Sequence, residues 1–228
     1  MTGFTRYAVY MVPEGEFYRA GAAWLGWDSV GGCPCPHPAL ADLPHPVQTL
    51  TATPRKYGLH ATIKPPFRLA HGTTAAALAH ATQSLCRGLA PVTLPGLAIR
   101  RLGGFVAAVP AAPSDALQTL AATVVAELDR FRAPPSASEL ARRRAAPLSP
   151  RHEALLQQWG YPYVMEAFRF HITLSGSLPV HDADRLCAIL GTHFAPVLPQ
   201  PCVIDSLCLM GEDDAGAFHL IHRYALSG

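Results

Sequence analysis

Two stretches of the chain decide its expected fold, Tyr57-Gly-Leu-His-Ala-Thr-Ile-Lys64 and Phe168-Arg-Phe-His-Ile-Thr-Leu174. Each is rich in residues that favour strands, and each carries a His-x-Thr tripeptide. Residues two apart in a strand point to the same face, so the histidine and the threonine of each tripeptide share a face. We therefore expect two strands that each present an imidazole beside a hydroxyl, the first of them closed by Pro65-Pro66.

The segments around these two strands follow the same order in both halves of the chain. A strand and a helix precede each His-x-Thr strand, and a helix and two strands joined by a glycine-containing turn follow it. This order indicates an internal repeat, with halves at about 5–133 and 161–228 and a helical insertion at 134–160. We expect an α+β fold in which residues 1–228 form a single bilobal domain. Two lobes related by pseudo-twofold symmetry, each an antiparallel sheet with outer helices, would enclose a central groove.

Hydrophobic periodicity and turn residues give the remaining elements. The expected strands are 6–12, 57–64, 92–101, 105–109, 168–174, 202–210 and 217–226. The expected helices are 16–25, 73–89, 114–131 and 182–194. Residues 31–46 are rich in Gly, Pro and Cys, which predicts an exposed loop.

Composition narrows the class of protein. The chain has 228 residues, of which 50% are hydrophobic and 15% charged, as in a folded globular protein. A formal net charge of +2 is too small for a general nucleic-acid binder, so anion recognition must come from a local cluster. We see no secretory signal and no apolar run of membrane-spanning length, and therefore expect a cytoplasmic protein with no membrane contact. Its six cysteines are then expected to be reduced.

Two imidazoles and two hydroxyls in one groove suit the chemistry of a phosphodiester. A neutral imidazole can take a proton from an attacking water, and a protonated one can give a proton to the leaving oxygen. Threonine hydroxyls can hold the non-bridging phosphate oxygens. We expect His60 and His171 to be the acid/base pair, with Thr62 and Thr173 beside them. This chemistry requires neither metal nor cofactor, and strained cyclic phosphodiesters fit it best.

Two His-x-Thr motifs about half a chain apart resemble the signature of the two-histidine (2H) phosphoesterase superfamily, which includes the RNA ligase-like cyclic phosphodiesterases. The surrounding stretches RYAVYMVP, AAWLGWD, YGLHATIKPPFRL and RHEALLQQWGYPYVMEAFRFHITLSG resemble a bacterial branch associated with phosphonate metabolism. The resemblance covers nearly the whole chain. It implies a two-lobed fold, His60 and His171 as acid and base, and Thr62 and Thr173 as phosphate binders.

Four further residues are candidate substrate contacts. By strand alternation, Lys64 shares the face of His60 and Thr62, and Arg169 shares the face of His171. Either cation could hold a phosphate oxygen; the alternatives are a surface lysine and an arginine paired with a carboxylate such as Glu166. Tyr7 and Tyr57 lie in strands near the motifs, where they could stack on a base or sugar or belong to the core.

Two clusters carry weaker signals. Arg142, Arg143 and Arg144 in the insertion could reach an anionic ligand over the groove or form a solvated helix face. Cys33 and Cys35, with His37 and His45 close by, could form a zinc site, but the absence of a second ligand pair at zinc-finger spacing favours a surface loop.

Hydrolysis of a cyclic or activated phosphodiester of a small metabolite is the function that the sequence favours. The expected partner is a small phosphorylated substrate, with no obligate protein partner. An RNA-end 2′,3′-cyclic phosphodiesterase remains an alternative, which the low net charge disfavours for long RNA. A non-catalytic nucleotide- or phosphate-binding module and a histidine-metal protein are the others. The two motifs are nearly symmetric, so the sequence leaves open which histidine is the base.

Overall fold

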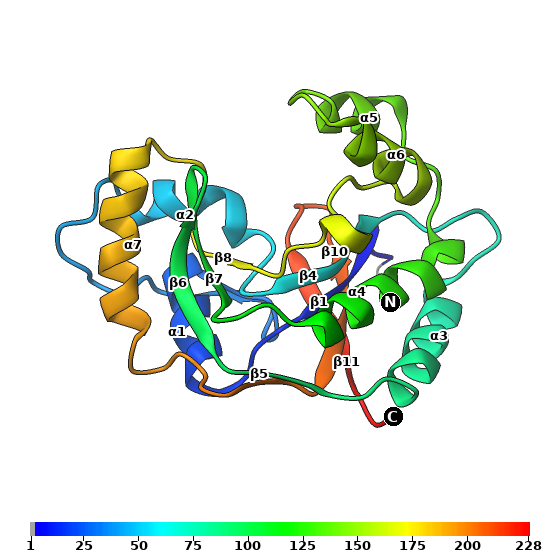
Figure 1. Ribbon diagram of the computed structural model, residues 1–228, viewed down its shortest axis with the longest axis horizontal. Coiled ribbons are helices and arrows are strands. Elements are labelled where there is room, and N and C mark those ends of the chain that lie inside the picture. Colours follow the sequence, from blue (N-terminus) through cyan, green and yellow to red (C-terminus); the bar gives the residue numbers. More distant parts are fainter. Residues whose placement is uncertain (1–2) are drawn as a thin grey trace.

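One seven-stranded sheet organises the structure, a computed structural model that describes residues 3–228 (Figure 1). In spatial order its strands are β11 (Phe218–Ala225), β10 (Ser206–Glu212), β1 (Arg6–Met11), β4 (Ala61–Phe67), β8 (Ile172–Thr173), β7 (Phe105–Pro110) and β6 (Leu97–Leu102). All neighbouring strands are antiparallel. Two small antiparallel pairs lie outside it: β2 (Trp27–Asp28) with β3 (Cys33–Pro34), and β5 (Val92–Leu94) with β9 (Cys202–Ile204).

Helices cover this sheet at both ends. They are α1 (Gly15–Leu25), α2 (Val47–Arg55), α3 (Ala75–Arg87), α4 (Asp115–Glu127), α5 (Ala137–Arg143), α6 (Pro150–Trp159) and α7 (Val180–Phe194), with 3-10 turns at Asp129–Phe131 and Met165–Ala167. Helix α7 packs against β6 and β7, whereas α3 packs against β10 and β11 and α4 against β4. The two helices of the insertion, α5 and α6, stand apart from these layers (Figure 1).

Strand pairing in the sheet is shortest between β4 and β8. These strands share one residue pair, Ala61 opposite Ile172, so the sheet divides into a four-stranded part, β11-β10-β1-β4, and a three-stranded part, β8-β7-β6. The α+β expectation of two lobes with antiparallel strands and outer helices is confirmed, and the single pair joins their sheets edge to edge. Strands from the two predicted repeat halves interleave, because β10 pairs with β1 while β6 and β7 lie beside β8.

Several element boundaries differ from those predicted. Strand β4 does not end before Pro65-Pro66 but continues to Phe67. Proline cannot donate a ladder hydrogen bond and is tolerated at irregularities, and here the β1–β4 register shifts between Tyr7 and Val9. Strand β8 contains only two residues of the predicted 168–174, and the predicted strands 92–101 and 202–210 are each broken into two. Helix α2 was not predicted, since it has no strong helix-forming pattern.

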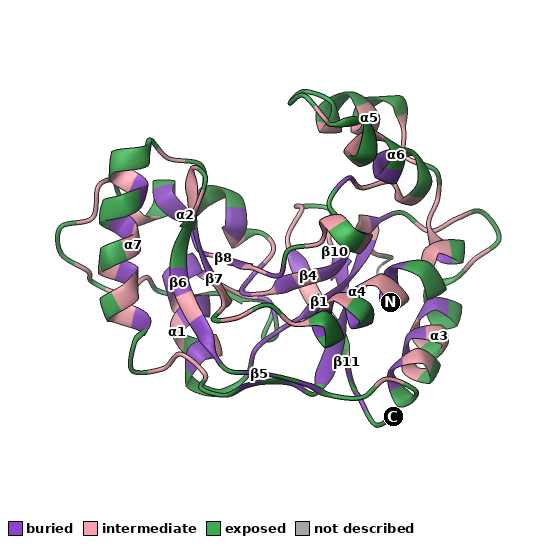
Figure 2. Cartoon of the chain, viewed as in Figure 1, coloured by how far each residue is buried: buried purple, intermediate pink, exposed green. Residues whose placement is uncertain are grey.

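The core lies between the sheet and these helices, where the buried residues are coloured purple in Figure 2. Helix α1 buries Phe17, Trp24 and Leu25, and its Trp24 side chain is completely buried. The Trp24 Nε1–H donates to the carbonyl oxygen of Leu174 at 2.7 Å. This bond ties α1 to the segment that directly follows the second His-x-Thr motif, and so helps to position that motif. Among residues 3–228, no helix combines the length and apolarity that a membrane crossing requires.

Replacing Trp24 by Phe should therefore destabilise the protein by about 2–4 kcal/mol, since it removes buried apolar contacts and leaves a buried carbonyl without its donor. Urea unfolding followed by circular dichroism measures this. Trp159→Phe is the control, because Trp159 is only partly buried. An equal loss in both variants would contradict the role given to the Trp24 hydrogen bond.

Candidate active site

His60 lies immediately before β4, and its ring is fixed by its own chain. Its Nδ1–H donates to the carbonyl oxygen of Gly58 at 2.9 Å. Gly58 adopts a left-handed backbone conformation, φ +72°, that glycine accepts without strain. The other ring nitrogen, Nε2, lies 3.1 Å from Oγ1 of Thr62 and accepts a hydrogen bond from this hydroxyl.

His171 repeats this arrangement before β8. Its Nδ1–H donates to the carbonyl oxygen of Arg169 at 2.7 Å, again two residues earlier in the chain. A hydrogen bond from Nδ1 fixes the tautomer of a neutral imidazole, so that Nε2 carries the lone pair. Both rings are thus held in the same tautomer by equivalent contacts, with Nε2 left for chemistry.

The register of β4 and β8 brings the two motifs together. Ala61 and Ile172 are paired directly, and both side chains are buried in the core. In an antiparallel pair, the neighbours of such residues lie opposite each other on the other face. The register therefore sets His60 beside Thr173 and Thr62 beside His171. Each histidine therefore lies opposite the threonine of the other motif. The spacing within a motif does not reveal this pairing, because it depends on the register of the two strands.

A cavity of about 490 Å³ opens on this face. Thr62, Arg169 and His171 line it. Aromatic side chains form much of the remaining wall: Phe105, Tyr161, Tyr163 and Phe168. Within the part of the chain that the structure describes, no Asp or Glu lines this cavity. The cavity therefore combines one motif residue of each half with an arginine and an apolar wall, which suits a small anionic ligand.

Burial makes His60 a weak base. Loss of solvation lowers its pKa to about 4; the hydrogen bond to Gly58 opposes this shift, and the positive charge of His171 adds to it. The ring of Tyr10 stacks on the imidazole with the ring centroids 3.8 Å apart and 24° between the planes. Tyr10 is completely buried, and its hydroxyl has no hydrogen-bond partner among residues 3–228. His60 is therefore neutral at neutral pH.

Lys64 does not face the groove. Only 2% of its surface is exposed, and its Nζ donates to the carbonyl oxygen of Val125 at 3.0 Å and to Asp129 at 3.2 Å. Val9 pairs with Lys64 and Tyr10 with Thr62, so β4 has an extra residue, Ile63, at this point. Such a bulge breaks the alternation of side chains, which is why the prediction that Lys64 shares the face of Thr62 is wrong.

The other three predicted contacts have different outcomes. Arg169 lines the cavity, and its suggested carboxylate partner Glu166 is paired with Arg151 instead. Tyr57 lies near the site, with its ring centroid 5.9 Å from that of His60. Tyr7 is buried in the main core on the opposite face of β1 from Tyr10, so it is not placed to contact a ligand in this groove.

The sequence reasoning missed five aromatic residues of the site: Tyr10, Phe105, Tyr161, Tyr163 and Phe168. Tyr10 stands on β1 opposite Thr62, and a correct register of β1 and β4 would have found it. Tyr161 and Tyr163 follow α6 and line the cavity. Their Tyr-Pro-Tyr sequence directly follows a helix-ending glycine, and this pattern predicts a loop. It does not predict that the loop lines the groove.

Comparison with known proteins shows the family to which this chain belongs. The family model described as "Protein of unknown function (DUF1045)" matches residues 62–219. The chain belongs to this family. Two curated relatives share 38% identity over 220 residues, in Janthinobacterium sp. (strain Marseille), and 36% over 217 residues, in Laribacter hongkongensis (strain HLHK9). Both are named ribose 1,5-bisphosphate phosphokinase PhnN. Each match covers 93% of this chain and 49% of the relative, so the chain spans about half the length of these relatives.

The solved structures similar to this DUF1045 protein share little sequence identity with it. A crystal structure of a phosphoesterase aligns with 99% of both chains at 14% identity and a TM-score of 0.48. TT0787 of Thermus thermophilus aligns over 98% of both chains at 14% identity and 0.48. E. coli LigT complexed with 3′-AMP aligns over 98% of both chains at 15% identity and 0.45.

The zinc site considered for Cys33, Cys35, His37 and His45 does not form among the described residues of the DUF1045 protein. Within residues 3–228, no three His, Cys, Asp or Glu side chains are grouped so that they could hold a metal ion. His37 is hydrogen-bonded to the carbonyl oxygen of Trp24 at 2.9 Å, and His45 lies 3.0 Å from Asp182. The predicted loop 31–46 contains the short strand β3 and is otherwise irregular up to α2.

The lowered pKa of His60 should appear as a pH-dependent stability. Between pH 6.5 and about 4 the unfolded chain binds a proton at this ring that the folded chain does not. The contribution of neutral His60 to the free energy of unfolding is therefore complete above pH 6.5. It is lost as the pH falls toward 4, and the total loss is about 1–3 kcal/mol. Urea unfolding of the wild type and of His60→Gln at pH 7.5, 6 and 5 measures it. The wild type should lose more stability than the variant, and parallel losses would contradict the assignment.

Proposed function

We propose that this protein is a phosphodiesterase that hydrolyses a cyclic or activated phosphodiester of a small metabolite, with His60 and His171 as its acid/base pair and no need for a metal. The observation that carries the proposal is that the His60 and His171 rings make the same hydrogen bond to the backbone. Each donates from Nδ1 to the carbonyl two residues earlier, and the β4–β8 register sets both on the face opposite the buried Ala61 and Ile172. On this face His171 lines the cavity directly, whereas His60 lies behind the lining residue Thr62, to which it is hydrogen-bonded.

The environment of the rings supports a different role for each. His60 is held neutral by burial, so it is the ring that accepts a proton from the attacking water at Nε2. His171 lines the open cavity and, in its protonated form, donates a proton to the leaving oxygen. Water oxygen forms the new bond to phosphorus as the bond to the leaving oxygen breaks. Transfer of a proton from His60 to solvent, and uptake of one by His171, then restore the starting state.

The threonines hold the phosphate in this scheme. Thr62 donates to Nε2 of His60 in the unliganded site. When a phosphate oxygen takes over this hydroxyl, Nε2 becomes available to the attacking water. Thr173, opposite His60 in the register, holds a second non-bridging oxygen, and Arg169 adds positive charge at the cavity wall. Donors aimed at charge that grows in the transition state are a large source of rate enhancement.

Two observations favour a small sugar phosphate as the substrate. The cavity of about 490 Å³ has the size of a small-molecule site. The curated relatives carry a name that refers to a ribose phosphate, and this chain corresponds to half of each. No Gly-x-x-x-x-Gly-Lys-Ser/Thr sequence occurs in the chain, so the phosphate loop common in kinases is missing here. We infer that this half makes or removes a sugar phosphate by hydrolysis, whereas the named phosphokinase activity belongs to the other half of the relatives.

Turnover of ribose 1,2-cyclic phosphate and of nucleoside 2′,3′-cyclic phosphates in the presence of EDTA tests the proposal. The wild type should hydrolyse at least one of them, with ribose 1,2-cyclic phosphate preferred. His60→Ala and His171→Ala should each lower kcat by about 10²–10⁴-fold, the usual contribution of a general acid or base.

His222→Ala is the matched control, because His222 lies on β11 and outside the cavity lining. Preference for the nucleoside substrates would favour an RNA-end phosphodiesterase instead. Activity that EDTA abolishes, or that survives both histidine substitutions, would contradict the two-histidine mechanism. Tight binding without turnover by well-folded protein would indicate a binding module.

A further inference from the structure

A second, smaller pocket adjoins the groove at the far end of β4. Its lining is dominated by arginines from four parts of the chain. They are Arg6 on β1, Arg68 after β4, Arg132 after the first 3-10 turn, and Arg142 and Arg143 on α5. Among the described residues, Glu139 is the only acidic one in this lining, and we call the site the arginine pocket.

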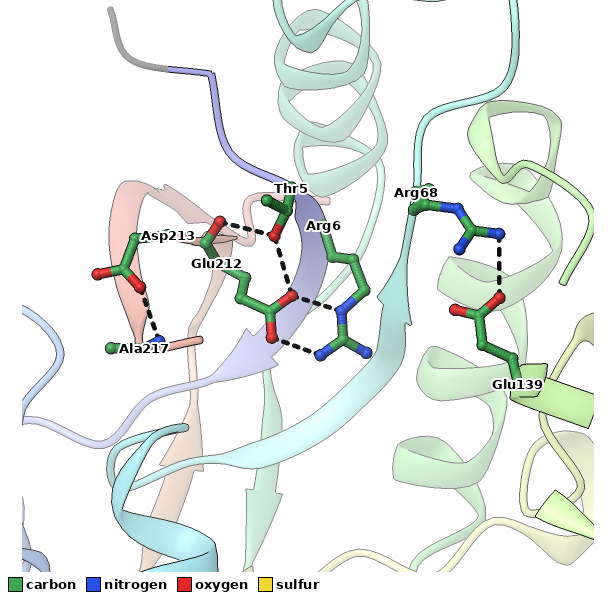
Figure 3. A network of polar contacts seen from close by, with 7 residues as sticks. All are labelled: Thr5, Arg6, Arg68, Glu139, Glu212, Asp213 and Ala217. Atoms are coloured by element: carbon green, nitrogen blue, oxygen red, sulfur yellow. Dashed lines mark hydrogen bonds and ion pairs between the residues drawn. The ribbon is translucent and has the colours of Figure 1, made fainter. Parts of the chain in front are cut away.

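Carboxylates orient the inner arginines without balancing the charge of the pocket. Glu212 binds Arg6 through two hydrogen bonds of 2.5 Å, and Glu139 pairs with Arg68 at 3.0 Å, so that the two guanidinium groups flank β4 (Figure 3). Asp129 pairs with Arg132 at 2.8 Å but also binds the buried lysine of β4. Three carboxylates are therefore ion-paired with four cations, the three inner arginines and the buried lysine.

Two further cations of the pocket have no carboxylate partner. Among the described residues, Arg142 and Arg143 take part in no ion pair, although their neighbour Arg144 is paired with Glu153 at 2.5 Å. Arg143 instead lies over the ring of Tyr161, with its guanidinium carbon 4.4 Å from the ring centroid. Like charges held this close repel one another, and a bound anion relieves that repulsion. Guanidinium groups match the geometry of phosphate oxygens in particular.

The linings of the arginine pocket and of the groove meet at two places along the chain, although no described residue lines both. Pro65 lines the groove and Pro66, the next residue, lines the arginine pocket. In the same way Gly160 lines the arginine pocket and Tyr161 lines the groove. Arg143, stacked on Tyr161, stands at this boundary. A ligand whose phosphodiester lies at the histidines can therefore extend toward the arginines.

We propose that the arginine pocket binds a second phosphate, a monoester, on the same small molecule whose diester is hydrolysed at the histidines. This assignment rests on the proposed function and narrows its substrate to a phosphorylated sugar cyclic phosphate. It also gives the insertion a role, because α5 brings the two unpaired arginines to the ligand. Specificity then comes from the monoester, whereas the chemistry occurs at the diester.

A matched pair of substrates tests this assignment: ribose 1,2-cyclic phosphate with and without a phosphate on its 5-hydroxyl. The wild type should prefer the phosphorylated substrate by about 10–100-fold in kcat/KM, the value of one or two charge-assisted hydrogen bonds. Arg142→Gln should lower this preference about 10-fold, through KM, and leave the unphosphorylated substrate unaffected. Arg142 suits the test because its replacement breaks no ion pair of the described structure.

Arg185→Gln is the control, since Arg185 is an exposed residue of α7 outside both pockets and carries the same charge. It should leave the preference intact. Equal turnover of both substrates by the wild type, or an equal effect of Arg142→Gln on both, would overturn the arginine pocket as a phosphate site while leaving the hydrolase intact.

Calorimetric titration with ribose 5-phosphate, a monoester without a diester, separates this inference from the proposed function. Binding that weakens in Arg142→Gln and persists in His171→Ala would support the pocket even if neither cyclic phosphate is hydrolysed. Binding that is insensitive to Arg142→Gln would reject the pocket.

Discussion

A single residue pair in the middle of the sheet, Ala61 opposite Ile172, sets the two His-x-Thr motifs side by side. Within residues 3–228 it is the only ladder contact between β4 and β8, and so it is where the two parts of the sheet are joined. Because both side chains point into the core, the histidine and threonine on either side of each lie on the opposite face, where Thr62 and His171 line the cavity. The hydrogen bonds from Nδ1 of His60 and of His171 then turn both rings to expose Nε2. The proposed chemistry depends on this register more than on any individual contact of the ligand cavity.

Much of this arrangement follows from the sequence. The paired His-x-Thr strands, the order of the elements around them and the helical insertion are all visible as patterns, since each depends on local periodicity and on turn residues. Details set by contacts between strands were not predictable in the same way. The bulge at Ile63 reverses the face of Lys64, and the burial of Tyr7 and the stacking of Tyr10 on His60 follow from how β1 is aligned with β4. No periodicity within one strand reveals its register against another.

The asymmetry between the two histidines also arises from packing rather than from sequence. Their tripeptides are nearly identical, and both rings make the same hydrogen bond to the backbone. The difference is that Tyr10 stacks on His60, whereas His171 lines the open cavity. Burial disfavours the charged form of an imidazole and lowers the pKa of His60, which is the ring that we propose as the base. The insertion adds a second asymmetry, because its Arg142 and Arg143 line a pocket at one end of β4 only.

In the proposed mechanism, His60 and His171 belong to one site and act in the same step. The kcat of a His60→Ala/His171→Ala double variant, measured beside the two single variants on the best cyclic phosphate, tests this most directly. Residues that act as a unit are strongly non-additive, so the double variant should be about as slow as the slower single variant. Losses that multiply, with the double variant slower by the product of the two single effects, would show that the histidines act independently and would contradict the account.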